Sequence, residues 1–464
     1  MSLKAATGKE KNRRAQGKKS GPRDVALELL GRGWIRGADW ERSFEGLPEN
    51  DRALVRNLVS GTFRQRGKID FYLGSFLRGE PQALPDRLLN ILRLAVYQLK
   101  FCDRLPDYAV VHEAVEQAKR LPGGGKLSGL VNGVLRTLLR EWDSIALPAA
   151  DRDPAAWLAV NYSHPLWLVR RYLGFHGFAF TEALLAANNT QAPLVVRSEE
   201  AAAGVPLEDS KLLRRFAGSG IKAGRGAYAP EALILSGNSP PPRALPGFEE
   251  GLLYLQDEAA MLPARLARPV PGSLILDLCA APGGKITHLA RLAGESAVLV
   301  AADLNPDRLA GLRENFSRLG LGGIKLYAGD ARFPALRRAD LVLCDVPCSG
   351  TGVMRRKPDL RWRIREEDLP ALAGLQREIL EAAAALTAPE GTLLYSTCSL
   401  EPEENWEVVR TFLDGHPDFR LEPADDFIDP RLVSPQGCLA SYPHIHGIDG
   451  AFAARLVRKK SKRR

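Results

Sequence analysis

The sequence has few cysteines and no long apolar run. Its 464 residues include only six cysteines, at positions 102, 279, 344, 348, 398 and 438. Six are too few for a disulfide framework in a chain of this size, which excludes a disulfide-stabilised secreted fold. No apolar run approaches the roughly 18 residues of a membrane-spanning helix, and residues 1–23 lack the apolar stretch of a secretory signal. We therefore expect a cytoplasmic protein.

Positive charge is concentrated at the two ends of the chain. The formal net charge is +9, but residues 1–23 carry eight Lys or Arg against one Glu, and residues 458–464 carry six Lys or Arg. The residues between these two basic tails therefore carry a net charge of −4. Basic tails attract polyanions in a salt-dependent way, so this distribution favours a nucleic acid as the partner.

The first half of the chain has patterns that predict a helical domain followed by a small mixed domain. In residues 24–145, apolar residues recur three and four positions apart, and Gly- and Pro-containing stretches separate the segments. This pattern predicts an all-helical bundle. Residues 155–245 predict a small α+β module, with strands expected at 192–198 and 231–237.

Residues 246–457 predict a third domain, in which strands and helices alternate. Amphipathic segments separate five short apolar segments, at 273–279, 297–303, 324–330, 339–346 and 391–399. This alternation is typical of a doubly wound α/β domain with a largely parallel sheet. Ligands in such domains bind outside the carboxyl ends of the strands.

A candidate nucleotide pocket follows the first three of these strands. Asp303 ends the second strand, where it can accept hydrogen bonds from ribose hydroxyls, and Asp330 ends the third, suited to an adenine amino group. After the first strand, small residues let a ligand approach the backbone, and the next helix offers N–H groups to a carboxylate or phosphate. The segment does not match G-x-G-x-x-G, so we predict an adenosine-containing ligand with a carboxylate. Its residues are Cys279, Ala280, Ala281, Pro282, Gly283, Gly284 and Lys285.

Two cysteines follow the fourth and fifth strands. Cys348 lies shortly after Asp345, and Cys398 lies in a Ser-Thr-Cys-Ser segment. Neighbouring strands lie ~4.8 Å apart, so we expect both thiols to face one pocket, where a thiolate is a good nucleophile. Zinc is not expected, because Cys344 lies inside an apolar strand and no C-x-x-C pair or His set accompanies it. We predict no metal site.

The motifs around these residues resemble the signature motifs of the Sun/Nop family of RNA 5-methylcytosine methyltransferases. The resembling segments are 277–285, 345–352 with 355–362, and 396–405. Residues 91–99 and 130–139 look like the NusB-like domain of one bacterial branch, which methylates a cytosine in small-subunit ribosomal RNA. The resemblance implies an all-α NusB-like RNA-binding bundle, the small α+β module and a Rossmann-like class I methyltransferase domain.

The resemblance also implies the reaction partners and the roles of the site residues. The co-substrate would be S-adenosylmethionine and the substrate 16S ribosomal RNA. Residues 279–285 would hold the methionine end, with Asp303 at the ribose, Asp330 near the adenine and Asp345 at the same pocket. As a thiolate, Cys398 would add to carbon 6 of the cytosine while Asp345 holds or protonates the ring at N3. Cys348 is tied to the release step. We expect a monomer without a membrane or an obligate protein partner.

Several alternatives stay open on the sequence alone. The two thiols can exchange roles, with Cys348 as nucleophile, and the same chemistry can act on a different RNA, such as a transfer RNA or another ribosomal site. An amino-group methyltransferase is disfavoured, because residues 345–348 read Asp-Val-Pro-Cys rather than an Asp/Asn-Pro-Pro-aromatic motif. A non-enzymatic RNA-binding scaffold is disfavoured because every cysteine and pocket acid is present.

A row of basic residues follows the Cys348 segment. We expect these side chains to line the RNA path, with Trp362 available for base stacking. The alternative is a solvated basic face. The row comprises Arg355, Arg356, Lys357, Arg361, Arg363 and Arg365.

Overall fold

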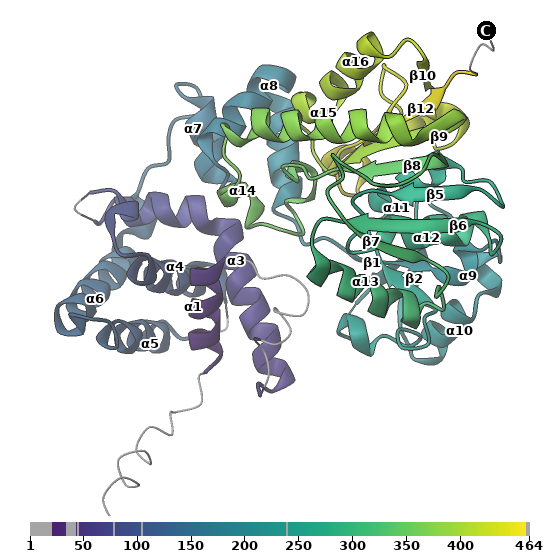
Figure 1. The fold of residues 1–464 in the computed structure, drawn as a ribbon. Coiled ribbons are helices and arrows are strands. Elements are labelled where there is room, and N and C mark those ends of the chain that lie inside the picture. Colours follow the sequence, from purple (N-terminus) through teal and green to yellow (C-terminus); the bar gives the residue numbers. More distant parts are fainter. Residues whose placement is uncertain are drawn as a thin grey trace, which may run out of the picture. The chain divides into compact units, whose positions relative to one another are not determined.

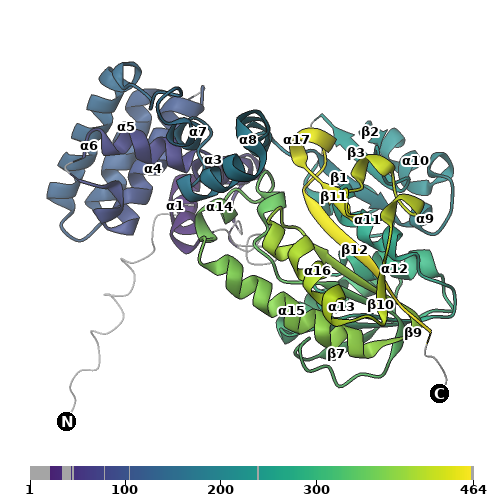
Figure 2. The same ribbon diagram turned by 90° about the horizontal axis from the view of Figure 1, so that it is seen from above.

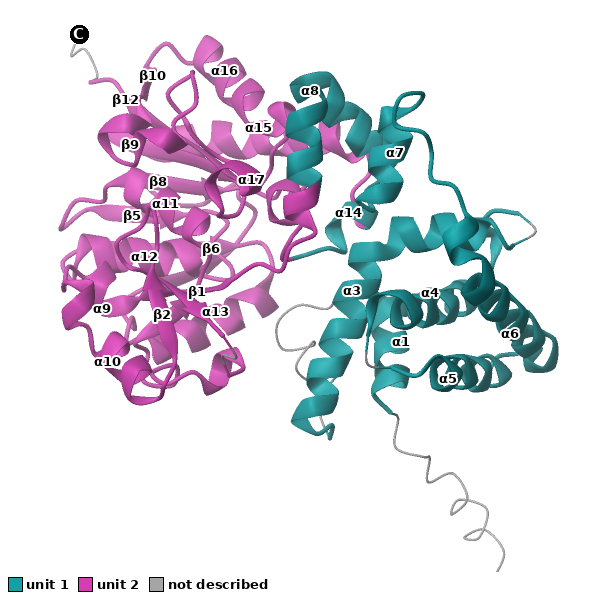
Figure 3. Ribbon diagram, turned by 180° about the vertical axis from the view of Figure 1, so that it is seen from behind, with its two compact units in different colours: residues 1–185, 357–362 teal, residues 186–356, 363–464 magenta. Residues whose placement is uncertain are grey.

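The computed structural model describes residues 21–33, 43, 46–77, 79–103, 105–237 and 240–460 (Figure 1). The chain divides into two compact units, one of residues 1–185 with 357–362 and the other of residues 186–356 with 363–464 (Figure 3). No helix in the described ranges is both long and apolar enough to cross a membrane. Most of the two basic tails, at 1–20 and 461–464, lies outside the described residues.

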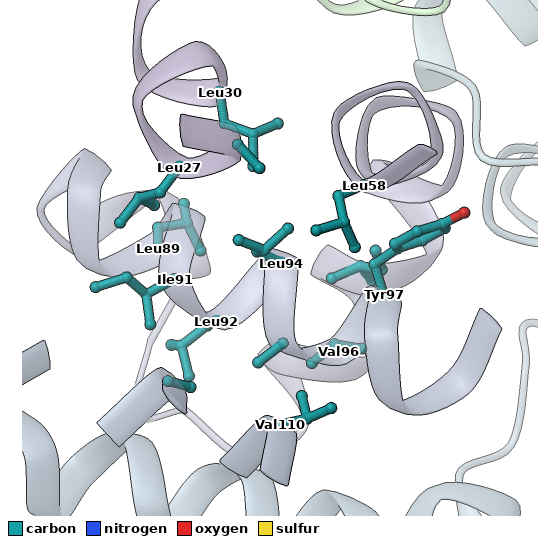
Figure 4. Close-up of a cluster of buried hydrophobic side chains, with 14 of the residues drawn as sticks. Leu27, Leu30, Leu58, Leu89, Ile91, Leu92, Leu94, Val96, Tyr97 and Val110 are labelled. Atoms are coloured by element: carbon teal, nitrogen blue, oxygen red, sulfur yellow. The ribbon is translucent and has the colours of Figure 1, made fainter. Parts of the chain in front are cut away.

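The first unit is helical, which confirms the prediction for residues 24–145. Leu58 of α3, Leu94 of α4 and Val110 of α5 are at most 1% exposed and belong to one hydrophobic core (Figure 4). The apolar residues spaced three and four apart therefore face this core. The helices are α1 (Pro22–Arg32), α3 (Glu49–Gly74), α4 (Asp86–Phe101), α5 (Asp107–Lys119), α6 (Gly124–Glu141), α7 (Pro154–Asn161) and α8 (Leu166–Asn188), of which α8 continues past residue 185, where the second unit begins.

The second unit begins with a small antiparallel sheet of four strands in the order β2-β3-β1-β4. The two predicted strands are confirmed as β1 (Leu194–Ser198) and β3 (Ala232–Ser236). β2 (Lys222–Arg225) and β4 (Leu253–Leu255) were not predicted, and β4 lies beyond residue 245, where we expected the module to end. Two short helices, α9 (Glu199–Ala202) and α10 (Lys211–Gly218), accompany the sheet.

The second sheet of this unit has eight strands, of which seven follow the order β10-β12-β9-β8-β5-β6-β7. All five predicted strands are present, and their pairings with one another are parallel. β10, β11 and β12 add antiparallel pairings after β9. The strands are β5 (Leu274–Asp277), β6 (Val298–Asp303), β7 (Lys325–Ala328), β8 (Ala339–Asp345), β9 (Thr387–Thr397), β10 (Phe419–Glu422), β11 (Leu439–Ser441) and β12 (Ala451–Arg458).

Helices pack on both faces of this sheet (Figure 2). One core takes buried residues from α11 (Glu258–Ala267), α12 (Gly284–Ala293) and α13 (Pro306–Arg318). A separate core takes buried residues from α15 (Asp368–Leu386) and α16 (Trp406–Gly415). A parallel sheet buried on both faces is the expected α/β architecture. Two one-turn helices, α14 (Leu360–Arg363) and α17 (Pro443–His446), complete the described helices of the chain.

Candidate active site

The carboxyl ends of the parallel strands bring the predicted site residues to one edge of the large sheet. β5 ends at Asp277, β6 at Asp303 and β8 at Asp345. Cys398 directly follows β9. β5 pairs with β6 on one side and with β8 on the other, so the strand order reverses at β5. Ligands of open α/β sheets bind at such a switch point.

The predicted cofactor segment forms the turn between β5 and α12. Gly283 has a φ of 108°, which an L-residue rarely adopts, and no side chain caps the N-terminus of α12. A side chain at Gly284 would begin 3.2 Å from the amide nitrogen of Gln256. Tyr254 donates a hydrogen bond from its hydroxyl to the carbonyl of Pro282, at 3.0 Å. The small residues therefore let the turn pack closely against the neighbouring side chains, which hold it in place.

The two predicted adenosine-binding acids, Asp303 and Asp330, are held by different partners. Asp303 is 3% exposed, and its carboxylate accepts hydrogen bonds from the N–H groups of Ala281 (3.2 Å) and Asn305 (3.0 Å). Its position is therefore fixed against the cofactor segment. Asp330 follows β7 and pairs with Arg332, at 2.7 Å. Hydrogen bonds from Arg332 lower the pKa of Asp330.

Asp277 is a buried acid of the site to which the sequence pattern assigned no role. It is 1% exposed, and one carboxyl oxygen accepts a hydrogen bond from the N–H of Cys279, at 3.2 Å. The other oxygen makes no hydrogen bond with any residue that the structure describes. Burial, and after it the nearby Asp345, raises the pKa of Asp277 to about 8. Asp277 is therefore a neutral carboxylic acid at pH 7.

Lys285 and Asp345 form an ion pair at the centre of the site. The Lys285 Nζ lies 2.6 Å from Asp345 Oδ2, and Ser396 donates a hydrogen bond to Oδ1 at 2.9 Å. Burial disfavours the charged form of Lys285, but the ion pair with Asp345 outweighs it and raises the lysine pKa. The electrostatic interaction with Cys398 raises the lysine pKa further. Reciprocally, the Lys285 ammonium favours the thiolate form of Cys398.

The two predicted catalytic thiols are in direct contact. The sulfur atoms of Cys348 and Cys398 lie 3.3 Å apart, and the Cys398 N–H lies 3.4 Å from the Cys348 sulfur. The hydrogen bond with Cys398, together with burial, raises the pKa of Cys348 well above its ordinary value. Cys348 therefore keeps its proton at neutral pH. The site holds one protonated thiol beside a second thiol that faces a cation.

The RNA-path interpretation of the basic row is wrong for three arginines and for Trp362. Arg355 is buried and pairs with Asp449 at 2.6 Å, and Arg356 pairs with the same carboxylate at 2.7 Å. Arg361 is fully buried and donates a hydrogen bond to the carbonyl of Ser163. The Trp362 indole donates to the carbonyl of Phe63 at 2.7 Å. The two members of the row that are exposed are Arg363 and Arg365.

Comparison with protein families matches three consecutive parts of the chain. Residues 264–457 match the 16S rRNA methyltransferase RsmB/F family, and residues 23–140 match the NusB family. Residues 164–240 match the RsmF/B-like ferredoxin-like domain. The helical part, the small sheet and the α/β domain are therefore each similar to a known module.

Individual relatives match nearly the whole chain. The chain is 34% identical over 463 residues to the probable ribosomal RNA small subunit methyltransferase B of Bacillus subtilis, covering 95% of this chain and 100% of that protein. It is 38% identical over 390 residues to ribosomal RNA small subunit methyltransferase B of Vibrio cholerae, covering 83% and 86%.

Solved structures agree with these relatives. The structure of PH0851 covers 93% of this chain and 97% of its own, with a TM-score of 0.79 and 28% identity. A methyltransferase homolog protein from Pyrococcus horikoshii covers 65% and 97%, with a TM-score of 0.56 and 27% identity. The resemblance to Sun/Nop methyltransferases is thereby confirmed, and the chain belongs to the RsmB/F family of 16S rRNA methyltransferases.

Proposed function

We propose that this enzyme transfers a methyl group from S-adenosylmethionine to carbon 5 of a cytosine in 16S ribosomal RNA, through a covalent bond between Cys398 and carbon 6. The observation that carries the proposal is the contact of two thiols, 3.3 Å apart, beside the Lys285–Asp345 ion pair. A methyl acceptor with a nucleophilic amino group needs no thiol. Cytosine carbon 5 does, because it becomes nucleophilic only after a group adds at carbon 6.

The residues of the β5–α12 turn and the strand-end acids fit S-adenosylmethionine. The uncapped N-terminus of α12 suits the methionine carboxylate, and Asp303, held against Ala281, suits the ribose hydroxyls. Asp330 follows the next strand, near the expected adenine position. The unpaired oxygen of Asp277 offers a further polar contact at the same edge. When bound, S-adenosylmethionine supplies the electrophilic methyl group.

The side chains at the centre of the site have different roles in the reaction of the cytosine. The Lys285 ammonium favours the thiolate of Cys398, which forms the bond to carbon 6. Negative charge then develops at N3 of the ring, next to the Asp345–Lys285 pair that holds the base edge. After methyl transfer a base accepts the proton from carbon 5, the freed electron pair re-forms the double bond between carbons 5 and 6, and the sulfur–carbon bond breaks so that Cys398 departs as a thiolate. Cys348, protonated and in contact with the Cys398 sulfur, assists this release by exchanging a proton with it.

The substrate assignment rests on the relatives, which are named as ribosomal RNA small subunit methyltransferases. The target base must leave its stack to lie between a thiol and a methyl donor, so we expect an accessible, single-stranded cytosine. The same chemistry on another RNA is the second candidate. A parallel assay with transfer RNA distinguishes the two.

The test is a methyl-transfer assay with labelled S-adenosylmethionine and unmodified 16S ribosomal RNA, followed by digestion to nucleosides. We expect label in 5-methylcytidine with the parent enzyme and none with Cys398→Ala. Cys344→Ala is the matched control, because Cys344 is a fully buried thiol on β8 outside the proposed chemistry. Label in a different nucleoside, or full activity of Cys398→Ala, contradicts the proposal.

A further inference from the structure

A single buried carboxylate links the two segments that carry the thiols. Glu404 is 0% exposed. Its Oε1 accepts hydrogen bonds from the backbone N–H of Ser349 and from the Gln376 side chain, both at 2.9 Å. Its Oε2 accepts from the hydroxyls of Ser349 and Ser399, both at 2.5 Å. Ser349 directly follows Cys348 and Ser399 directly follows Cys398, so Glu404 binds the next residue after each thiol.

Further hydrogen bonds join the same two segments. The N–H of Gly352 donates to the carbonyl of Cys398 at 2.9 Å, and the N–H of Leu400 donates to the hydroxyl of Thr351 at 2.8 Å. Glu404 is itself held in place, because the Tyr395 hydroxyl donates to its backbone carbonyl at 2.6 Å. The contact between the sulfur atoms is therefore the outcome of a rigid polar network centred on one charge.

We propose that Glu404 is a positioning residue of the methyl-transfer reaction, which holds the sulfur atoms of Cys348 and Cys398 in contact and keeps the proton on Cys348. The proposal rests on the proposed function for its catalytic consequence. Its structural consequence, the unequal protonation of the two thiols, is independent of any substrate.

The charged groups near the two thiols favour this unequal protonation. Cys348 interacts electrostatically with Cys398, Glu404 and Tyr395. The hydrogen bond with Cys398 and burial contribute most to the raised pKa of Cys348, and the negative Glu404 acts in the same direction. On the other side of the pair, the Lys285 ammonium interacts with Cys398. The negative Glu404 therefore favours the protonated form of Cys348, and the Lys285 ammonium favours the thiolate form of Cys398.

The test is Glu404→Gln, which keeps the shape of the side chain and removes its charge. A short pulse of iodoacetamide at a series of pH values, read out by peptide mass spectrometry, gives the ionisation of each cysteine. We expect Cys348 in this variant to be alkylated at lower pH, and roughly tenfold faster near neutral pH, which corresponds to a pKa about one unit lower. Methyl transfer is expected to lose roughly tenfold or more in kcat, with KM for S-adenosylmethionine unchanged.

Glu407→Gln is the matched control, because Glu407 is exposed on α16, three residues along the chain. Its alkylation profile and its kcat are expected to equal those of the parent. If the pH dependence of Cys348 alkylation is the same in Glu404→Gln and Glu407→Gln, the proposal is overturned. Should Glu404→Gln fail to fold, Ser399→Ala removes one hydroxyl from the carboxylate and leaves the charge. It is expected to lower kcat several-fold, and an unchanged kcat overturns the positioning role.

The two hypotheses fail in different ways. Absence of methyl transfer by the parent enzyme contradicts the proposed function, whereas the alkylation profile uses no RNA and still measures what Glu404 does to Cys348.

Discussion

Asp277 shows how one buried side chain constrains the whole site. Its carboxyl group ends β5, is 1% exposed and has a pKa raised to about 8 by burial, with Asp345 adding to the effect. A second negative charge beside Asp345 would compete for the Lys285 ammonium. Because Asp277 stays protonated at pH 7, the ion pair between Lys285 and Asp345 keeps its full strength.

Asp277 should make stability fall as the pH rises. An Asp in the unfolded chain titrates near pH ~3.9, so between that pH and about 8 the folded protein binds a proton that the unfolded chain has released. The contribution of Asp277 to the free energy of unfolding is therefore complete below its pKa in the unfolded chain. It declines as the pH rises from there to its pKa in the folded protein. We expect Asp277→Asn to remove this decline, with a difference on the order of a few kcal/mol in the free energy of unfolding.

Urea unfolding of the parent and Asp277→Asn at a series of pH values measures this effect. Asp425→Asn, at an exposed position, is the control and should retain the decline of the parent. Parallel stability curves for the parent and Asp277→Asn would show that the carboxyl group is ionised in the folded protein.

At the scale of elements, α12 connects the cofactor segment to the small sheet. Arg197 of β1 is fully buried and donates hydrogen bonds to the carbonyl of Gly284 at 2.7 Å and to the hydroxyl of Thr287 at 2.9 Å. Its guanidinium also pairs with Glu199 at 2.7 Å. The first turn of α12 is therefore fixed by a neighbouring sheet and not only by its own strand.

Gly283 sets the direction in which α12 leaves β5, and an alanine there should weaken ligand binding. Its φ of 108° strains any residue with a side chain, at a cost of roughly 1–2 kcal/mol. We expect Gly283→Ala to lower the affinity for S-adenosylmethionine about tenfold by calorimetric titration. Gly294→Ala is the control, since Gly294 ends the same helix with a φ of 74°. Gly294→Ala should lower stability but leave the affinity for S-adenosylmethionine unchanged. Equal affinities of the two variants would contradict a specific role of Gly283 in ligand binding.

The sequence predicts those elements whose signal is local. The five parallel strands could be predicted because each is a short apolar run followed by a segment with the apolar spacing of an amphipathic helix. β2 and β10 were missed because their short segments, KAGR and FRLE, lack such a run. Both thiols follow strand ends, so their convergence was predictable. The burial of Arg355 was not, because its partner Asp449 lies 94 residues away. The role of Glu404 was missed for the same reason, since Ser349 lies 55 residues away.

At the scale of the whole molecule, charge is divided between a mildly acidic body and two basic tails. We therefore expect the tails, rather than the body, to contribute most of the general attraction for RNA. Such attraction raises affinity for any polyanion without selecting a cytosine. We therefore expect the choice of the methylated cytosine to depend on the site at the carboxyl edge of the large sheet.

Neutralising the C-terminal tail should reduce the salt dependence of RNA binding. The triple variant Lys462→Gln, Arg463→Gln, Arg464→Gln keeps the length of the chain and removes three positive charges. The plot of log affinity against log salt is expected to become shallower by about two, since each phosphate contact contributes ~0.7–0.9 to its slope. Binding titrations with 16S ribosomal RNA at several salt concentrations measure it. An unchanged slope would mean that this tail does not contact RNA.

The central claim is that Cys398 forms the covalent bond and Cys348 assists its release, and trapping the intermediate tests it most directly. Cys348→Ala, incubated with 16S ribosomal RNA and S-adenosylmethionine, is analysed on a denaturing gel, and the cross-linked peptide is identified by mass spectrometry. We predict an accumulating protein–RNA adduct through Cys398, and neither adduct nor product with Cys398→Ala. An adduct that accumulates with Cys398→Ala and maps to Cys348 would show that the two thiols have the opposite roles.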